Sequence, residues 1–180
     1  METHVMIDLE TMSLRHDAAI VALGAVKFDP RAETVGTFIG APFYMTCSLK
    51  SSQDAGLHVD AGTVMWWLEQ DGQARDELRD NNAAGPLDNV LNEFFIWFGQ
   101  KSLPTWGNGA GFDNVILRNA YRAFGGYCPF RYKHDRCYRT ISGLFPNTVY
   151  VPPAIAHHAL HDAQAQATHL QRLFNFIARG

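Results

Sequence analysis

The pattern of hydrophobic and polar residues predicts strands early in the chain and mostly helices after them. Apolar runs predict strands over residues 5–9, 18–28, 35–47 and 103–106. Apolar residues at helical spacing predict helices over residues 61–70, 73–79, 86–98, 112–124, 137–144 and 157–178. Three successive strands joined by short turns indicate an antiparallel meander. The whole order indicates an α/β fold, a mixed sheet covered by helices.

Length and charge narrow the class of protein. The 180 residues fit a single domain, 1–180, that is large enough to bury a sizeable core. The net charge of −3 argues against a broadly basic protein that coats nucleic acid. A nuclease stays open, because bound divalent cations supply positive charge where phosphate sits.

Hydropathy and cysteine usage bear on the compartment. No apolar run is long enough to span a membrane, so no membrane partner is expected, and the N-terminus lacks the layout of a signal peptide. Cys47, Cys128 and Cys137 are odd in number and lack C-x-x-C spacing. They favour reduced thiols in a cytoplasmic protein over a disulfide framework or a zinc site.

The first predicted strand ends in two acids. Side chains alternate between the faces of a strand, so Asp8 and Glu10 point the same way while Leu9 points to the opposite face. Two like charges at this spacing repel each other, and this repulsion is costly unless a cation lies between them. Oxygen ligands suit a hard divalent ion, Mg²⁺ or Mn²⁺. The alternative is an exposed acidic strand end without a metal.

Three later segments carry further candidates. Asp113 follows a glycine-rich turn and falls in the first turn of a helix. It either interacts with the helix dipole or lies close to Asp8 and Glu10. Asp162 begins the last helix and is able to aim its carboxylate at a metal. His157, in the preceding loop, is suited to take a proton from water. A solvated or helix-capping histidine loop and a transition-metal site are the alternatives. Arg139, after the charged turn at Asp135, either pairs with an acid or contacts phosphate.

The ordered set of these residues resembles a known family. Asp8-Leu9-Glu10, then Asn108 with Phe112-Asp113, then His157 with Asp162, resemble the three motifs of the DEDDh 3′–5′ exonucleases. These enzymes belong to the DnaQ-like branch of the ribonuclease H-like fold. The order, identities and intervals match over nearly the whole chain.

One subgroup of that family looks most similar. The segments 8–12 and 17–21, and the pair Trp66-Trp67 with Gln70 one turn later, resemble a phage and bacterial subgroup. It includes the Rv2179c-like exoribonucleases and the phage DexA-like exonucleases. The departures are the residues Gly-Ala-Gly inside motif two and two extra histidines in motif three, His158 and His161. The motif spacing selects His157 as the base.

The resemblance implies a ribonuclease H-like mixed sheet, with a three-strand antiparallel meander plus parallel strands, flanked by helices. It implies a metal-dependent 3′–5′ exonuclease that releases nucleoside 5′-monophosphates from single-stranded DNA or RNA, in the cytoplasm of a bacterial or phage-infected cell. Asp8 would bridge two Mg²⁺ or Mn²⁺ ions, Glu10 and Asp162 would complete one site, and Asp113 would hold the other through water. His157 would deprotonate the attacking water.

The resemblance also implies substrate contacts. Thr11 and Met12 would lie beside the terminal nucleotide, and Leu9 or Met12 would wedge between the last two bases. One tryptophan of the Trp66-Trp67 pair is expected in the core and the other at the site, where it would stack on a base. The remaining substrate-binding candidates from motif two are Asn108 and Phe112.

Other functions remain alternatives. One is a catalytically silent nucleic-acid-binding module on the same fold, although the four carboxylates and the histidine argue against silence. Another is an oligoribonuclease-type enzyme for very short fragments, which the acidic charge balance favours. A transition-metal hydrolase would need histidines from several elements.

Family members are often dimers, so the helix around residues 94–98 serves either a homodimer interface or the core. The choice between DNA and RNA is open.

Overall fold

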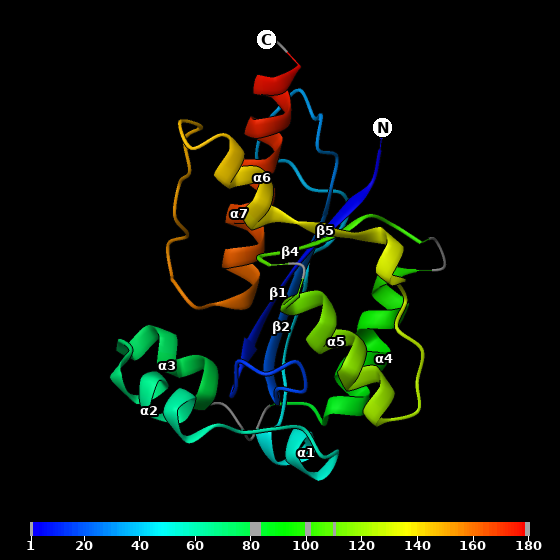
Figure 1. Cartoon of the computed structure of the whole chain (residues 1–180), viewed down its shortest axis with the longest axis vertical. Coiled ribbons are helices and arrows are strands. Elements are labelled where there is room, and N and C mark those ends of the chain that lie inside the picture. The colour runs from blue at the N-terminus through cyan, green and yellow to red at the C-terminus, as the bar shows by residue number, and fades with distance from the viewer. Residues whose placement is uncertain (1, 80–83, 100–101, 110, 179–180) are drawn as a thin grey trace.

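The computed structural model describes residues 2–79, 84–99, 102–109 and 111–178. Its centre is a mixed sheet with the strand order β3-β2-β1-β4-β5 (Figure 1). The antiparallel meander consists of β1 (His4–Thr11), β2 (Ile20–Phe28) and β3 (Phe43–Thr46). The strands parallel to β1 are β4 (Thr105–Gly107) and β5 (Asp135–Cys137). The predicted ribonuclease H-like sheet is confirmed.

Strand alternation in β1 separates two cores. Val5, Ile7 and Leu9 face a large core that includes residues from the helices α4 (Leu87–Phe98) and α5 (Asp113–Ala123). Met6 faces the opposite side, where α6 (Tyr138–Leu144) and α7 (Ala159–Ile177) pack. Figure 1 shows these helix pairs on opposite sides of the sheet. The even-numbered face of β1 therefore carries Met6 into a core and then presents Asp8 and Glu10 beside α7.

The remaining helices lie between β3 and α4 or directly before β5 (Figure 1). They are α1 (Leu49–Asp54), α2 (Ala61–Glu69), α3 (Gly72–Arg79) and the short 3₁₀ helix η1 (Tyr132–His134), which lies before β5. Asp60 is the N-cap of α2, because its Oδ1 accepts a hydrogen bond from Thr63 N at 2.9 Å. Trp67 Nε1 donates to Thr11 O at 3.0 Å and so ties α2 to the end of β1.

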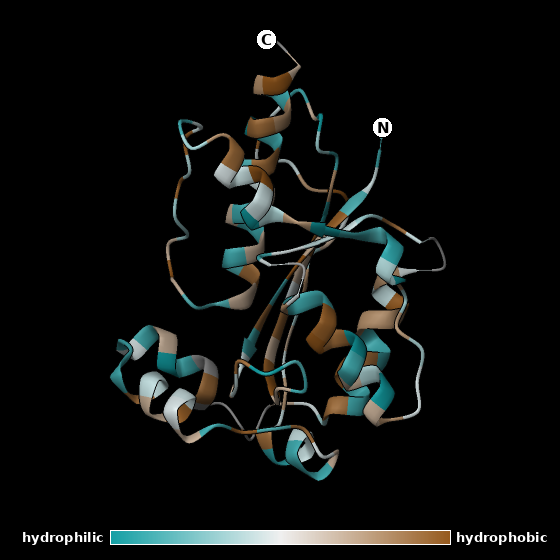
Figure 2. Ribbon diagram, in the orientation of Figure 1, coloured by the Kyte–Doolittle hydropathy of each residue, from teal (hydrophilic) through white to brown (hydrophobic). Residues whose placement is uncertain are grey.

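Hydropathy follows the layers. In Figure 2 the helices α4 and α5 alternate between brown and teal along their length, as helices with one buried face do. Phe94 and Phe98 of α4 are fully buried, so this helix serves the core, whereas Phe95 is half exposed. No helix in the described ranges is long and apolar enough to cross a membrane. The homodimer stays a prediction.

The structure corrects the predicted elements in two places. The strand predicted over residues 35–47 is only Phe43–Thr46, because Gly36 and Gly40 adopt left-handed φ values of 85° and 71° that interrupt an extended run. The charged turn predicted at Asp135 is instead strand β5, and its acid is paired with Arg118 at 2.6 Å. Helix α1 was not predicted. Ala110, inside the second motif, lies outside the described residues.

Candidate active site

The acids at the end of β1 meet a third acid from α7. One carboxylate oxygen from each of Asp8, Glu10 and Asp162 lies within 4.8 Å of the others. The strand supplies the first two on one face, and the first turn of α7 supplies the third. This separation suits a shared cation with oxygen ligands.

A glycine in β2 allows the third acid to reach the other two. Gly24 pairs with Asp8 in the antiparallel register. A Cβ atom built on Gly24 would overlap the backbone carbonyl carbon of Ala159 and the backbone nitrogen of Leu160. The first turn of α7 therefore rests directly on the backbone of β2, which brings Asp162 beside Asp8.

Asp113 approaches the same place from α5. Its Oδ1 accepts a hydrogen bond from Leu9 N at 3.2 Å, and its Oδ2 accepts one from Asn108 N at 2.9 Å. A Cβ on Gly107 would lie only 2.9 Å from Asp113 Oδ2, so this close approach also requires glycine. Asp113 is thus connected to β1 itself and is not only a partner of the helix dipole.

His157 precedes α7 in a strained backbone conformation. Its φ of 58° is the one positive value among the non-glycine residues that the structure describes. Such a conformation costs on the order of 1–3 kcal/mol. Its ring meets Trp66 edge-on, with centroids 5.0 Å apart. The extra histidines lie elsewhere: His158 stacks against Tyr44 at 4.6 Å and against His161 at 3.9 Å.

These side chains line a cavity of about 250 Å³, which we call the carboxylate cavity. Its residues are Asp8, Leu9, Glu10, Asn108, Phe112, Asp113, Arg139, His157, Asp162 and Gln166. Of the three clustered histidines, only His157 is among them, which agrees with the choice that the motif spacing makes.

Two further polar residues line the carboxylate cavity: Gln166, which the sequence analysis missed, and Arg139, whose partner it left open. Gln166 Nε2 donates to Asp8 Oδ1 at 2.9 Å, and Gln166 is only 3% exposed. It lies one helical turn after Asp162, and this i,i+4 spacing is a signal that could have identified it. Arg139 lines the cavity and donates to the backbone oxygen of Asn108 at 2.9 Å. It forms no salt bridge with an acid in the described part of the chain, although its positive charge favours the ionised form of Asp113 and so opposes the rise in the Asp113 pKa.

The electrostatics of the carboxylate cavity favour a cation. Burial raises the pKa of Asp8 well above its usual range, and repulsion from the three neighbouring carboxylates raises it further. Burial raises the pKa of Asp113 to about 7, although backbone hydrogen bonds from Leu9 and Asn108 oppose the shift. Burial also raises the pKa of Asp162. Crowded, buried carboxylates with these shifts fit a divalent ion with a preference for oxygen, because the ion would stabilise their charged form.

A second cavity, of about 390 Å³, adjoins the first, and we call it the aromatic cavity. The two cavities share Leu9, Glu10 and Phe112. The aromatic cavity adds Thr11, Leu14, Asp60, Gly62, Thr63, Trp66 and Trp67. Sequence reasoning missed Leu14, a large apolar side chain that is 81% exposed at this cavity.

As predicted, one tryptophan of the pair is buried and the other is not. Trp67 is 2% exposed, whereas Trp66 is 41% exposed and lines the aromatic cavity. Met12 lines neither cavity and packs within the large core. Leu9 and Thr11 do line the aromatic cavity. Of the two residues predicted as a wedge, Leu9 lines the cavities and Met12 does not.

Comparison with known proteins places this geometry in a family. Residues 3–174 match the model of the 3′-5′ exoribonuclease Rv2179c-like domain. The chain belongs to this family. The Rv2179c-like chain is also similar to the exodeoxyribonuclease of Enterobacteria phage T4, with 26% identity over 125 residues that cover 65% of this chain and 55% of the phage protein.

The fold of the Rv2179c-like chain resembles that of Exonuclease I from E. coli. Its zinc-bound complex with single-stranded DNA matches with a TM-score of 0.68 and 16% identity, over 99% of this chain and 43% of that one. Its complex with a dA16 oligonucleotide matches with a TM-score of 0.66 and 16% identity, over 99% and 43% of the respective chains. The chain thus spans about half the length of these relatives.

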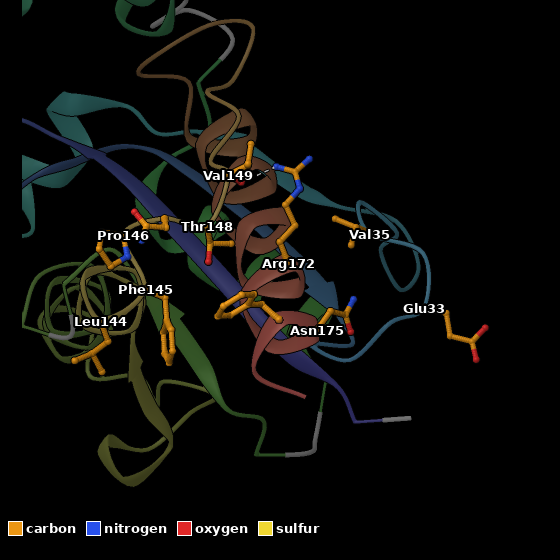
Figure 3. A pocket seen from close by; sticks show the side chains of 11 residues that line it. Glu33, Val35, Leu144, Phe145, Pro146, Thr148, Val149, Arg172 and Asn175 are labelled. Carbon is orange, nitrogen blue, oxygen red and sulfur yellow. Dashed lines mark hydrogen bonds between the residues drawn. The ribbon is translucent and has the colours of Figure 1, made fainter. Parts of the chain in front are cut away.

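A larger cavity lies apart from this site. It measures about 610 Å³ and lies between the segment after α6 and the C-terminal half of α7 (Figure 3). Leu144, Phe145 and Val149 line it, and Arg172 Nη1 donates to the backbone oxygen of Val149 at 3.1 Å. This cavity shares no residue with the carboxylate cavity, and Glu33 is the one acid among its described lining residues. We therefore choose the carboxylate cavity as the candidate active site because of its clustered acids, although the separate cavity has the larger volume.

Proposed function

We propose that this Rv2179c-like protein is a divalent-metal-dependent 3′–5′ exonuclease that hydrolyses single-stranded nucleic acid to nucleoside 5′-monophosphates. The observation that carries the proposal is the convergence of Asp8, Glu10 and Asp162 within 4.8 Å, with Asp113 and His157 in the same cavity. Family membership supports the reaction, because the family model describes a 3′-5′ exoribonuclease domain.

Each carboxylate has a proposed role in holding the ions. Asp8, Glu10 and Asp162 would hold a metal ion between them, and Asp113 would contribute to the ion site from α5. Two Mg²⁺ or Mn²⁺ ions held there supply stabilisation of the attacking and leaving oxygens in an in-line displacement at phosphorus. Gln166 orients Asp8, because its Nε2 donates to Asp8 Oδ1 at 2.9 Å.

The remaining polar groups have roles in proton transfer and binding. A ring nitrogen of His157 would take the proton from the attacking water, a contribution of about 10²–10⁴-fold in rate. Arg139 supplies positive charge at the cavity wall for a phosphate oxygen. Its guanidinium is positioned by Asn108 through hydrogen bonds to the backbone and side-chain oxygens at 2.9 and 3.4 Å.

The aromatic cavity is the proposed seat of an unpaired base. Trp66 would stack on it, a contact worth roughly 1–3 kcal/mol per base, and Leu9 and Leu14 would pack against it. The polymer is a single strand with either sugar. The family model describes an exoribonuclease, the phage T4 relative is an exodeoxyribonuclease, and E. coli Exonuclease I has been crystallised with single-stranded DNA.

Single-stranded DNA and RNA of matched sequence, labelled at the 3′ or the 5′ end, test the proposal. Each is incubated with Mg²⁺, Mn²⁺ or a chelator, and the variant Asp8→Ala serves as the control. We expect stepwise shortening from the 3′ end that requires both metal and Asp8, and the preferred sugar identifies the substrate. If neither polymer nor dinucleotides and trinucleotides were cleaved while metal bound, the protein would be a binding module on an exonuclease fold.

A further inference from the structure

Trp66 is the side chain that connects the two cavities. Its ring lines the aromatic cavity and also meets the His157 ring edge-on, at 5.0 Å between centroids and an interplanar angle of 85°. His157 lines the carboxylate cavity. One indole therefore contacts the space proposed for a base and the histidine proposed to accept a proton.

His157 is held by its neighbours in two ways, because its backbone donates a hydrogen bond to the Asp162 carboxylate and its ring contacts Trp66. It lies outside α7, and its backbone φ of 58° belongs to a region that residues other than glycine rarely adopt. A conformation of this kind persists only when its surroundings hold it. The ring contacts that hold the His157 imidazole are with Trp66 and, at 6.2 Å, with Trp67.

The two tryptophans differ in how firmly they are held. Trp67 is buried, and its Nε1 donates to Thr11 O, so its ring is fixed to the end of β1. Trp66 is 41% exposed, and its ring rests edge-on against Trp67 at 5.1 Å. The Trp67 ring is thus held in one position. The exposed Trp66 ring is the one whose position a bound base would restrict.

We propose that Trp66 is a positioning residue whose indole holds the His157 imidazole in the carboxylate cavity, so that a base seated in the aromatic cavity helps to set the proton acceptor. This inference rests on the proposed function. It differs from simple base stacking, because it predicts an effect of Trp66 on substrates that have no base.

Two chromogenic esters separate these roles. Thymidine 5′-monophosphate p-nitrophenyl ester carries a base, and methyl p-nitrophenyl phosphate does not; water attack at phosphorus releases p-nitrophenolate from both. We expect Trp66→Ala to lower kcat on both esters by about 10- to 100-fold, the loss typical of a misplaced catalytic group. Trp66→Phe should retain most of the rate, because it keeps an aromatic ring against His157. The matched control is Leu68→Ala, which removes a 57% exposed side chain from the same helix and should leave kcat unchanged.

A double-mutant cycle tests whether Trp66 acts through His157. Adding Trp66→Ala to His157→Ala should cause no further loss of kcat on methyl p-nitrophenyl phosphate. Losses that multiply would overturn the proposal. A rise in KM confined to the base-bearing ester, with kcat unchanged, would also overturn it and leave Trp66 as a stacking residue alone.

A spectroscopic readout is independent of turnover. The ring signals of His157 are assigned by their absence in His157→Asn and followed by NMR. They should move in Trp66→Ala, stay in place in Leu68→Ala, and respond to thymidine 5′-monophosphate in the wild type. Unchanged His157 signals in Trp66→Ala would refute positioning. If the wild type cleaved no ester or labelled polymer, the proposed function would fail, and the NMR result would still decide the positioning.

Discussion

The two adjoining cavities are built in different ways. The carboxylate cavity takes its acids from β1, which is paired on both sides, and from the first turns of α5 and α7. Gly24 and Gly107 allow those helices to approach so closely. The aromatic cavity instead uses exposed side chains, Trp66 at 41% and Leu14 at 81%. The acids proposed for chemistry are thus fixed by backbone packing, whereas Trp66 and Leu14, proposed for substrate contact, lie on an accessible rim.

The largest effect is expected from the histidine that serves the carboxylate cavity. We expect His157→Ala to lower kcat by about 10²–10⁴-fold, because the water loses its proton acceptor, while metal binding and the melting temperature stay close to wild type. Single-turnover rates and calorimetric metal titrations check this. His158→Ala and His161→Ala are the matched controls, and a larger loss in either one would show that the base is assigned to the wrong residue.

A second large effect should result from filling the space at Gly24. The added Cβ of Gly24→Ala would overlap the backbone of Ala159 and Leu160, so the first turn of α7 must move away from β2. We expect a loss of about 1–3 kcal/mol in the free energy of unfolding and roughly a 100-fold loss of activity as Asp162 leaves Asp8. Urea unfolding and kinetics measure both.

The control for that variant is Gly143→Ala on α6. A Cβ at Gly143 meets nothing within 4 Å, and its φ is not in the left-handed region. The free energy of unfolding of Gly143→Ala should therefore rise by about 0.5–1 kcal/mol through helix propensity, and the variant should keep full activity. Equal behaviour of the two variants would show that the contact between Gly24 and α7 is not what sets the site.

Metal stabilisation should depend on pH in a defined direction. The raised pKa values of Asp8, Asp113 and Asp162 mean that the metal-free folded protein binds more protons than the unfolded chain. Each contribution to stability is complete below about pH 4, the range of unfolded carboxyl groups, and is lost as the pH rises through the folded pKa of that group, which is about 7 for Asp113.

Metal ions bind the ionised carboxylates, so the shift in melting temperature caused by Mg²⁺ or Mn²⁺ should grow between about pH 5 and pH 8. Differential scanning calorimetry with and without metal measures this shift. Asp8→Asn should remove most of it at every pH. A metal-induced shift of the same size at both ends of this range would contradict the raised pKa values.

The smallest effect is expected at the rim of the aromatic cavity. Leu14→Ala should raise KM for single-stranded oligonucleotides a few-fold and leave kcat unchanged, because the loss of a partly buried apolar contact is worth about 1 kcal/mol or less. Leu144→Ala, which shortens a 69% exposed leucine at the separate 610 Å³ cavity, is the control. A fall in kcat for Leu14→Ala would mean that the two cavities do not divide binding from chemistry.

Sequence reasoning succeeded where one regular element sets the geometry. Asp8 and Glu10 could be assigned to one face because strands alternate with period two, and Asp162 because it opens a long helix. Strand β5 was missed because it is three residues long, Asp-Arg-Cys, and has no hydrophobic pattern. Its position comes from pairing with β4, a contact distant in sequence.

The residues missed at the site also depend on contacts that are distant in sequence. The spacing of Gln166 from Asp162 is visible in the sequence, yet its hydrogen bond to Asp8 depends on how α7 is placed on the sheet. Leu14 comes after β1 in an irregular segment, so no periodicity indicates that it is exposed beside Trp66. Met12, expected at the terminal nucleotide, turns into the core, because the register of β1 is irregular between Glu10 and Thr11 and strict alternation ends there.

The central place of β1 has a consequence for partial unfolding. The amide hydrogens of β1 that bond to β2 or to β4 should exchange with solvent only when the whole protein unfolds. Helix α2 is tied to β1 through the hydrogen bond of Trp67, and two of its apolar side chains, Met65 and Leu68, are each 57% exposed. It should open at lower free energy. In mild denaturant, the protein would therefore release a nucleotide base before it loses the ability to bind metal.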